Sequence, residues 1–465
     1  MARHPEPPAF EPVPAAEAER EPGSAAVPEP GHGDGGAGGG VSSALPAGAG
    51  RFASLAPLRR RNYALLWSGG LVSNIGSWMQ TVAVGALVIA HTGKATWAVV
   101  IAAGAFLPIG VLAPVGGALA DRIPRRAALV TGNLVAGVVA LVIALLVAAG
   151  RDGPGVLTLL VTAQGCVSAL ISPFQQAILP DLVPRPEFLP AVSLNSAQYN
   201  LGRVIGPALA GATVAAFGYP IAFVANAVSF LAVVIALAFI RLAPPPGRDE
   251  RLGLAASLRL GFEAARGEPG CRAAIGMIAV VGLLASPFIA LVPAMAHRLS
   301  HSGARGVASA TGILTTAQGV GAVLGALAVT PLARRFSRGR VLFVSLLLLP
   351  PALGLYAFSP TLLFGFASLF LVGLIYIGVL SGLSTVVQLR APTEYRGRVL
   401  SFYLVALGVS YPIGSLLQGP IADQVGLAWT TLGAAALLAA TLVTLRMTRP
   451  GVFRVLAATP PISAG

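Results

Sequence analysis

The chain has 465 residues, of which 55% are hydrophobic and only 10% are charged, and its mean hydropathy is +0.80. This composition is too apolar for a soluble globular domain and indicates a polytopic membrane protein, so we expect the lipid bilayer as its main partner. The net charge is +14, yet the basic residues lie in short clusters between apolar runs. Such clusters are typical of membrane loops, and they argue against nucleic-acid binding.

The first segment, residues 1–56, is rich in Pro, Gly, Ala and Glu and has no apolar periodicity. A segment of this kind buries too little surface to offset the entropy lost on ordering. It also lacks the basic start and the apolar run of a signal peptide. We therefore expect a disordered cytoplasmic tail.

Beyond the tail, the chain is a series of apolar segments, each close to the ~20 residues that an α-helix needs to cross a bilayer. The sequence predicts twelve such helices, at Ala64–Ala90, Thr96–Ala120, Ala127–Gly150, Val156–Leu179, Leu189–Phe217, Ile221–Arg241, Ala273–His297, Ala308–Ala333, Val341–Phe358, Thr361–Leu389, Val399–Ala422 and Leu427–Leu445. If the amino terminus is cytoplasmic, the outer loops carry only Lys94, Arg151, Arg298 and Arg305, and the inner loops carry the arginine clusters. This asymmetry predicts that both termini are cytoplasmic.

Two features divide the chain into halves. The longest internal loop, residues 242–272, carries Leu254, Leu258 and Phe262 at helical spacing, which predicts an interfacial helix. The motif LADRIPRR also returns as LARRFSRG after the second segment of the second half, as in transporters built from repeats. We therefore predict an all-α fold of two six-helix pseudo-repeats: a bundle over 57–241, a cytoplasmic linker over 242–272, a second bundle over 273–447 and a cytoplasmic tail over 448–465.

Arg203 lies in the fifth predicted helix, about 14 residues or roughly 20 Å from its cytoplasmic start, and therefore near the middle of the membrane. A charge at that depth costs at least about 2.5–3.5 kcal/mol unless it faces water or a partner. We expect Arg203 to point into an aqueous cavity. The alternative is a structural role, in which the guanidinium caps the carbonyls of a broken helix.

Polar side chains form stripes on three predicted helices. They are Asn74, Ser77, Trp78 and Thr81 on the first helix, Gln164, Ser168, Ser172 and Gln175 on the fourth, and Ser196, Asn200, Arg203 and Pro207 on the fifth. If the stripes converge, they line a path for a small molecule, and the residues predicted to bind it are Asn74, Trp78, Thr81, Gln164, Ser168, Asn200 and Arg203. The alternative is that these side chains form hydrogen bonds between helices and have only a structural role.

No acidic residue lies near the middle of any predicted membrane-spanning segment. The remaining candidates for proton coupling are Asp121, Asp181 and Glu394 near the inner rim and Asp423 near the outer end of the eleventh helix. A cavity with Arg203 and no deep acid favours anionic or hydrogen-bond-rich neutral substrates. The sequence has no nucleotide-binding, metalloprotease or nucleophile-elbow motif, so we expect no enzyme activity, no cofactor and no metal.

The sequence GALADRIPRR resembles the loop motif between helices two and three of the major facilitator superfamily, in which Gly117, Asp121, Arg122, Arg125 and Arg126 match. Pro124 stands where that family prefers glycine. The resemblance implies a gating role for Asp121, Arg122, Arg125 and Arg126, through ion pairs made in one conformation and released in another. The alternative is that these arginines only set the topology.

The stretch LNSAQYNLGRVIGPALAG is similar to the fifth-helix motif of exporters in the same superfamily. Gly202, Gly206, Pro207 and Gly211 match it, and Ala210 replaces one glycine. Small residues at this spacing let two helices approach closely, and we expect these four residues to pack against neighbouring helices.

Over residues 60–447 the sequence resembles the branch of that superfamily that contains bacterial macrolide efflux proteins and the enterobactin exporter. The resemblance implies a multi-pass protein of the bacterial inner membrane that exports a drug, antibiotic or secondary metabolite by alternating access, with protons as the candidate coupling ion. We expect a monomer. One alternative is a siderophore exporter of the enterobactin type, and a further one is a membrane sensor or assembly factor that does not transport.

Overall fold

The computed structural model describes residues 53–120, 123–240, 254–300 and 302–457. The predicted disordered tail lies almost wholly outside these residues, as do Asp121, Arg122 and the last eight residues of the chain. The last four residues of the predicted tail and the three that follow, Ala53–Arg59, form a short 3-10 helix, η1. The described residues form one compact unit.

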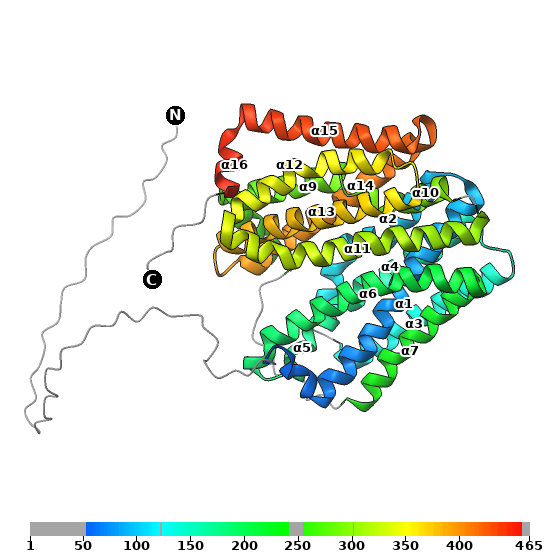
Figure 1. Ribbon diagram of the computed structural model, residues 1–465. Helices are drawn as coiled ribbons and strands as arrows, with labels where there is room; N and C mark the ends of the chain where they lie inside the picture. Colours follow the sequence, from blue (N-terminus) through cyan, green and yellow to red (C-terminus); the bar gives the residue numbers. More distant parts are fainter. Residues whose placement is uncertain (1–52, 121–122, 241–253, 301, 458–465) are drawn as a thin grey trace, which may run out of the picture. The chain divides into compact units, whose positions relative to one another are not determined.

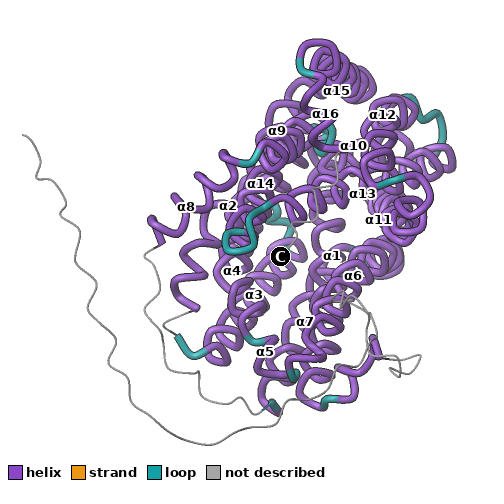
Figure 2. Tube along the Cα trace, turned by 90° about the vertical axis from the view of Figure 1, so that its left-hand side faces the viewer, coloured by secondary structure: helices purple, strands orange, loops and turns teal. Residues whose placement is uncertain are grey.

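The described residues are helical, with no strand among them (Figure 2). The longer helices are α1 (Arg61–Thr92), α2 (Ala95–Ala120), α3 (Arg125–Ala148), α4 (Pro154–Ala177), α6 (Phe188–Phe217), α7 (Tyr219–Phe239), α9 (Pro269–Leu284), α10 (Phe288–Leu299), α11 (Gly303–Phe336), α12 (Arg338–Ala357), α13 (Leu362–Arg390), α14 (Arg396–Val425) and α15 (Leu427–Thr448). The shorter ones are α5 (Leu179–Leu182), η2 (Arg185–Glu187), α8 (Leu254–Gly267) and α16 (Pro450–Ala457).

Eleven spans among the described residues are long and apolar enough to cross a membrane, with α9 and α10 together forming one of them. The remaining predicted span, α6, has 30 residues but is not among the eleven, because it carries polar residues such as Asn195, Gln198 and Arg203. Counting α6, the helices correspond to the twelve predicted segments. The prediction of an all-α membrane fold is therefore confirmed.

The predicted continuous helix Ala273–His297 is wrong in one respect, because the structure breaks it between α9 and α10 at residues 285–287. Pro287 has no N–H to donate, and the amide and hydroxyl of Ser286 both donate to the carbonyl of Val281. The segment therefore crosses as two shorter helices. Three further short elements were not predicted, namely α5, η2 and α16, and α16 lies where only a tail was expected.

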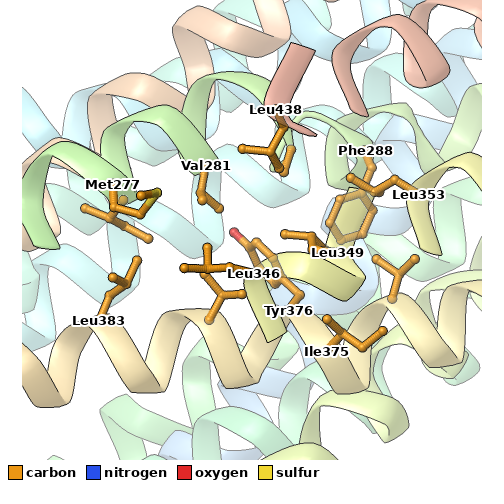
Figure 3. Packing of buried hydrophobic residues seen from close by; sticks show 14 of the residues in the cluster. Met277, Val281, Phe288, Leu346, Leu349, Leu353, Ile375, Tyr376, Leu383 and Leu438 are labelled. Carbon is orange, nitrogen blue, oxygen red and sulfur yellow. The ribbon is translucent and has the colours of Figure 1, made fainter. Parts of the chain in front are cut away.

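The helices pack in two sets (Figure 1). In the first half α1 packs on α6 and α7, and α4 packs on α2 and α3. In the second half α13 packs on α11 and α12, and α14 packs on α9. The largest apolar cluster belongs to the second half, where Val281, Leu346 and Tyr376 meet (Figure 3). The halves meet mainly along two pairs of helices, α6 with α11 and α2 with α14.

Candidate functional site

A cavity of about 830 Å³ lies within the first half, where the three polar stripes come together. Its lining includes Asn74 and Ser77 of α1, Ser168, Ser172 and Gln175 of α4, and Ser196 and Asn200 of α6. Further lining residues that the stripes did not include are Tyr63, Trp67, Asn133, Asn195 and Gln198. The convergence brings polar side chains from three helices to one cavity.

The seven residues predicted to bind a small molecule do not all line this cavity. Asn74, Ser168 and Asn200 line it, and Trp78, Thr81, Gln164 and Arg203 do not. Thr81 is exposed and donates to the carbonyl of Ser77 in its own helix. The Oε1 of Gln164 is buried and has no hydrogen-bond partner among the described residues.

Several of the cavity's polar groups also hold α1 against α6. Asn74 donates through Nδ2 to the carbonyl of Gln198 at 3.1 Å, and Trp67 donates through Nε1 to the carbonyl of Leu194 at 2.9 Å. The hydroxyl of Tyr63 lies 3.0 Å from the carbonyl oxygen of Ala191 and donates to it. These donors form hydrogen bonds between α1 and α6. Asn74 therefore contributes to helix packing as well as to the cavity wall.

Glycines let α6 approach its neighbours on two sides. A Cβ built on Gly206 would lie 2.5 Å from the Cβ of Trp78 in α1, and one on Gly202 would lie 2.8 Å from the amide of Asn74. On the other side, a Cβ on Gly312 of α11 would lie 2.5 Å from the carbonyl oxygen of Pro207. No side chain fits at such distances, so α6 is held at backbone contact between α1 and the second half.

Arg203 is half-buried at the level where α6 first meets α11. A Cβ on Gly319 of α11 would lie 3.1 Å from its carbonyl oxygen. Its guanidinium carbon lies 5.9 Å from the ring centroid of Trp78, a cation–π geometry. The charge also lies within electrostatic range of Tyr376 and Tyr411 in the second half. Arg203 has no ion pair with any described residue. Its charge can therefore interact only with water, aromatic rings or a ligand.

Contacts between the halves gather at one end of the helices, which we call the closed end, at residues 92–96, 217–219, 302–304 and 423–427. There the hydroxyl of Tyr219 donates to the carbonyl of Ala304 at 2.7 Å. Between described residues, the other hydrogen bonds and ring contacts across the halves reach no deeper than about mid-helix, at Thr316–Val204 and Phe106–Tyr411.

One acid at the closed end, Asp423 on α14 of the second half, contacts the first half. Its carboxylate accepts hydrogen bonds from the amide of Ala95 at 2.6 Å, the amide of Thr96 at 3.1 Å and the hydroxyl of Thr96 at 2.5 Å. These are the first residues of α2, whose free amides and positive helix dipole favour an anion. One half therefore caps a helix of the other.

The opposite end of the helices, which we call the cavity end, holds the lining residues between 63–77, 168–179 and 188–200. Arg60 pairs with Glu187 at 2.8 Å, Arg125 pairs with Asp181, and Arg390 pairs with Glu268 at 3.1 Å. Each of these pairs lies within one half. The hydrogen bond from Arg60 holds the pKa of Glu187 below its ordinary value.

Of the four predicted gating residues, Arg125 and Arg126 lie at this cavity end. Asp121 and Arg122 lie outside the described residues. Arg125 binds Asp181, and Arg126 donates through Nη2 to the carbonyl of Ala238 at 3.2 Å, so both contact the first half to which they belong. The sequence had offered Asp181 as a coupling candidate, and in this structure it is a partner for Arg125.

Helices that can span a membrane are packed in two sets that meet at one end, and a polar cavity lies at the opposite end; this arrangement is that of a membrane transporter of the major facilitator type. The chain belongs to this superfamily, in the family described as "Transmembrane secretion effector", whose profile matches residues 52–457. The resemblance found in the loop and helix motifs is thereby confirmed.

Two relatives and one solved structure extend this assignment. The chain is 26% identical over 381 residues to the multidrug efflux pump Tap of Mycolicibacterium fortuitum, which covers 80% of this chain and 92% of that protein. It is 29% identical to the enterobactin exporter EntS of Salmonella typhimurium, over 70% of this chain and 77% of that protein. Its fold is similar to an inward-facing, unoccupied bacterial homologue of the lysosomal transporter Spinster, with a TM-score of 0.64 at 16% identity, covering 85% and 97% of the two chains.

Proposed function

We propose that the protein exports a small molecule across the bacterial inner membrane by alternating access and that this structure is its inward-facing form. The observation that carries the proposal is the asymmetry between the two ends: the halves bind each other at the closed end, and the polar cavity lies at the other. With both termini cytoplasmic, as the basic loops predict, the cavity end faces the cytoplasm. A cargo would then enter from the cytoplasm and stop below the closed end.

Arg203 would mark the deepest point that a cargo reaches from the cavity. It lies where contact between the halves begins, it has no acidic partner among the described residues, and Trp78 offers it only a ring face. A guanidinium in that position binds a carboxylate, phenolate or carbonyl oxygen well and repels a cation. We therefore propose anionic or hydrogen-bond-rich neutral cargo.

A siderophore exporter is the second candidate, and the unpaired charge of Arg203 favours it. Catecholate siderophores carry acidic phenols and many amide groups, which suit one cation surrounded by Ser, Asn and Gln side chains. The likeness to the enterobactin exporter supports this candidate, and the likeness to the efflux pump Tap supports a drug as cargo. Both candidates predict the same inward-facing cavity and differ in the cargo that competes for it.

Transport into inverted membrane vesicles tests the proposal. The probes are a catecholate siderophore, a macrolide, an anionic dye and a cationic dye, each with and without an imposed pH gradient. Arg203→Ala should raise the KM for the transported anionic or neutral probe tenfold or more, since a hydrogen bond to a charged group contributes about 1.5–3 kcal/mol. Arg203→Lys should recover part of the loss.

The matched control is Arg151→Ala, which removes an exposed arginine from a loop of the first half. It should leave the KM unchanged. Transport of the cationic dye alone would contradict the proposed cargo class, and absence of flux with every probe would support the non-transporting sensor. A dependence on the pH gradient would identify protons as the coupling ion.

A further inference from the structure

A second cavity, of about 360 Å³, lies in the second half at the point where α12, α15 and α16 meet. Three arginines from three different helices line it: Arg340 of α12, Arg446 of α15 and Arg454 of α16. The rest of its wall is mainly apolar and includes Leu342, Phe343, Leu346, Phe453 and Leu456. The cavity shares no residue with the one in the first half.

The wall of this second cavity is fixed by close packing of α16. A Cβ on Gly339 of α12 would lie 2.5 Å from the Cα of Ala457, so the two helices touch through their backbones. Phe453 is buried, and its ring stands edge-on to that of Phe343 with the centroids 5.9 Å apart. Figure 1 shows α16 turning back beside α12 after the end of α15. The three arginines are therefore carried on a packed scaffold.

Within the part of the chain that the structure describes, no negative side chain pairs with these three charges. The lining segments, residues 337–346 and 446–457, contain no Asp or Glu and include two further arginines, Arg338 and Arg449. Arg340, Arg446 and Arg454 are all exposed and make no ion pair with a described residue. Like charges that face one space repel each other, so an anion that enters it is stabilised by all three.

The surface next to the arginines is apolar and faces outward from helices that can span a membrane. Leu347 of α12 is 58% exposed, and Val443 and Met447 of α15 are 57% and 77% exposed. In the expected orientation, this end of the helices lies in the cytoplasmic leaflet, where anionic lipids gather and basic pockets between helices bind their headgroups. The occupant that fits has a phosphate at one end and hydrocarbon at the other.

We propose that this second cavity binds an anionic phospholipid, with the phosphate among Arg340, Arg446 and Arg454 and an acyl chain along Phe343 and the exposed face of α12 and α15. The bound lipid stabilises the docking of α16, because it neutralises the charges that α16 brings beside α12 and α15. The site is independent of the cargo and of the direction of transport. A free phosphate shares the headgroup chemistry but cannot use the apolar wall.

Native mass spectrometry of the full chain, released from detergent, tests the proposal. The probes are phosphatidylglycerol, phosphatidylcholine and inorganic phosphate. The variant Arg340→Gln/Arg446→Gln/Arg454→Gln removes the three charges, and Arg59→Gln/Arg61→Gln/Arg185→Gln removes three other exposed arginines as the matched control. Wild type and control should retain phosphatidylglycerol, and the site variant should bind it about fivefold more weakly for each arginine lost. The added lipid should also raise the unfolding temperature of wild type and control, but not that of the site variant.

Three results would overturn the proposal. Equal loss of lipid in the two triple variants would mean that net charge alone attracts it. Equal binding of phosphatidylcholine would mean that the arginines do not select the headgroup. Binding of inorganic phosphate as tightly as the lipid would assign the site to a soluble anion. An unfolding temperature of the lipid-free site variant close to that of wild type excludes misfolding as the cause of a loss.

Discussion

The closed end and the cavity end of the helices are built from different chemistry. Toward the closed end the halves meet through glycines, with Gly312 against the backbone of Pro207 and Gly419 against the side chain of Val99. The ion pairs of the cavity end each lie within one half, as in Arg60–Glu187 and Arg125–Asp181. Packing is therefore the main contact between the halves, and the ion pairs stabilise each half separately.

This difference bears on how the closed end opens. Glycine contacts are lost without leaving a charge unpaired, and the polar contact of Asp423 with the start of α2 lies at the helix ends. There the carboxylate and the two amides regain water once they separate, so opening carries no penalty from buried orphan groups. A small difference in packing energy is then enough to shift the equilibrium between two states.

The largest effect is expected where the backbones of the two halves touch. Gly312→Leu places a side chain 2.5 Å from the carbonyl oxygen of Pro207, and no rotation of a side chain can relieve a clash with backbone atoms. The closed end should be forced apart, and transport should fall to the background rate, because the inward-facing state is lost. Spin labels at Lys94→Cys and Ser302→Cys, in a chain with Cys166 and Cys271 replaced by Ser, should report a longer distance between the halves.

The control for this change is Gly433→Leu in α15, where a Cβ would meet nothing within 4 Å. It adds the same side chain to a helix outside the contact between the halves. Transport and the label distance should stay as in the parent chain. An unchanged label distance in Gly312→Leu would show that the halves are not held by this contact.

A smaller effect is expected from the polar contact of the closed end. Asp423→Ala removes the cap on α2, and loss of such a cap costs about 0.5–2 kcal/mol. The outward-open population should rise about two- to thirtyfold, as measured by the same pair of labels. Asp152→Ala is the control, because Asp152 pairs with His91 at 3.3 Å within the first half. If Asp152→Ala opened the halves as much, the cap would have no special role.

The fold could be predicted from the sequence because apolar length and basic loops are strong signals. The helix α6 sets the limit of that prediction: it is too polar to be found by hydropathy alone, and several of its polar residues, such as Asn195, Gln198 and Asn200, line the cavity. The break before Pro287 was missed, since a proline inside an apolar run is often only a kink. The helix α16 was missed because its eight residues are too few to show periodicity.

The candidate site was predicted in outline, since polar stripes at helical spacing identify the face that turns inward. The sequence does not predict that Asn74 donates to the carbonyl of Gln198 or that Arg203 does not line the main cavity. Both depend on the relative axial position of α6 and α1. The role of Asp423 as the cap of α2 could also not be predicted from the sequence. Its partners, Ala95 and Thr96, stand more than three hundred positions earlier in the chain.

The smallest effect is expected at the cavity end, where Arg60 and Glu187 join the start of α1 to the segment before α6. The hydrogen bond from Arg60 holds the pKa of Glu187 below its ordinary value, so the stabilisation is complete above the ordinary pKa of a glutamate and is lost as the pH falls through the lowered pKa. Glu187→Gln should lower the unfolding temperature by no more than about 2 °C at pH 7, and the difference from wild type should vanish in acid. Glu263→Gln, which removes an ion pair with Arg259 within α8, is the control for a general effect of charge. Transport at pH 7 should be unchanged in both variants, because neither ion pair joins the two halves. A transport defect confined to Glu187→Gln would mean that contacts at the cavity end also control gating.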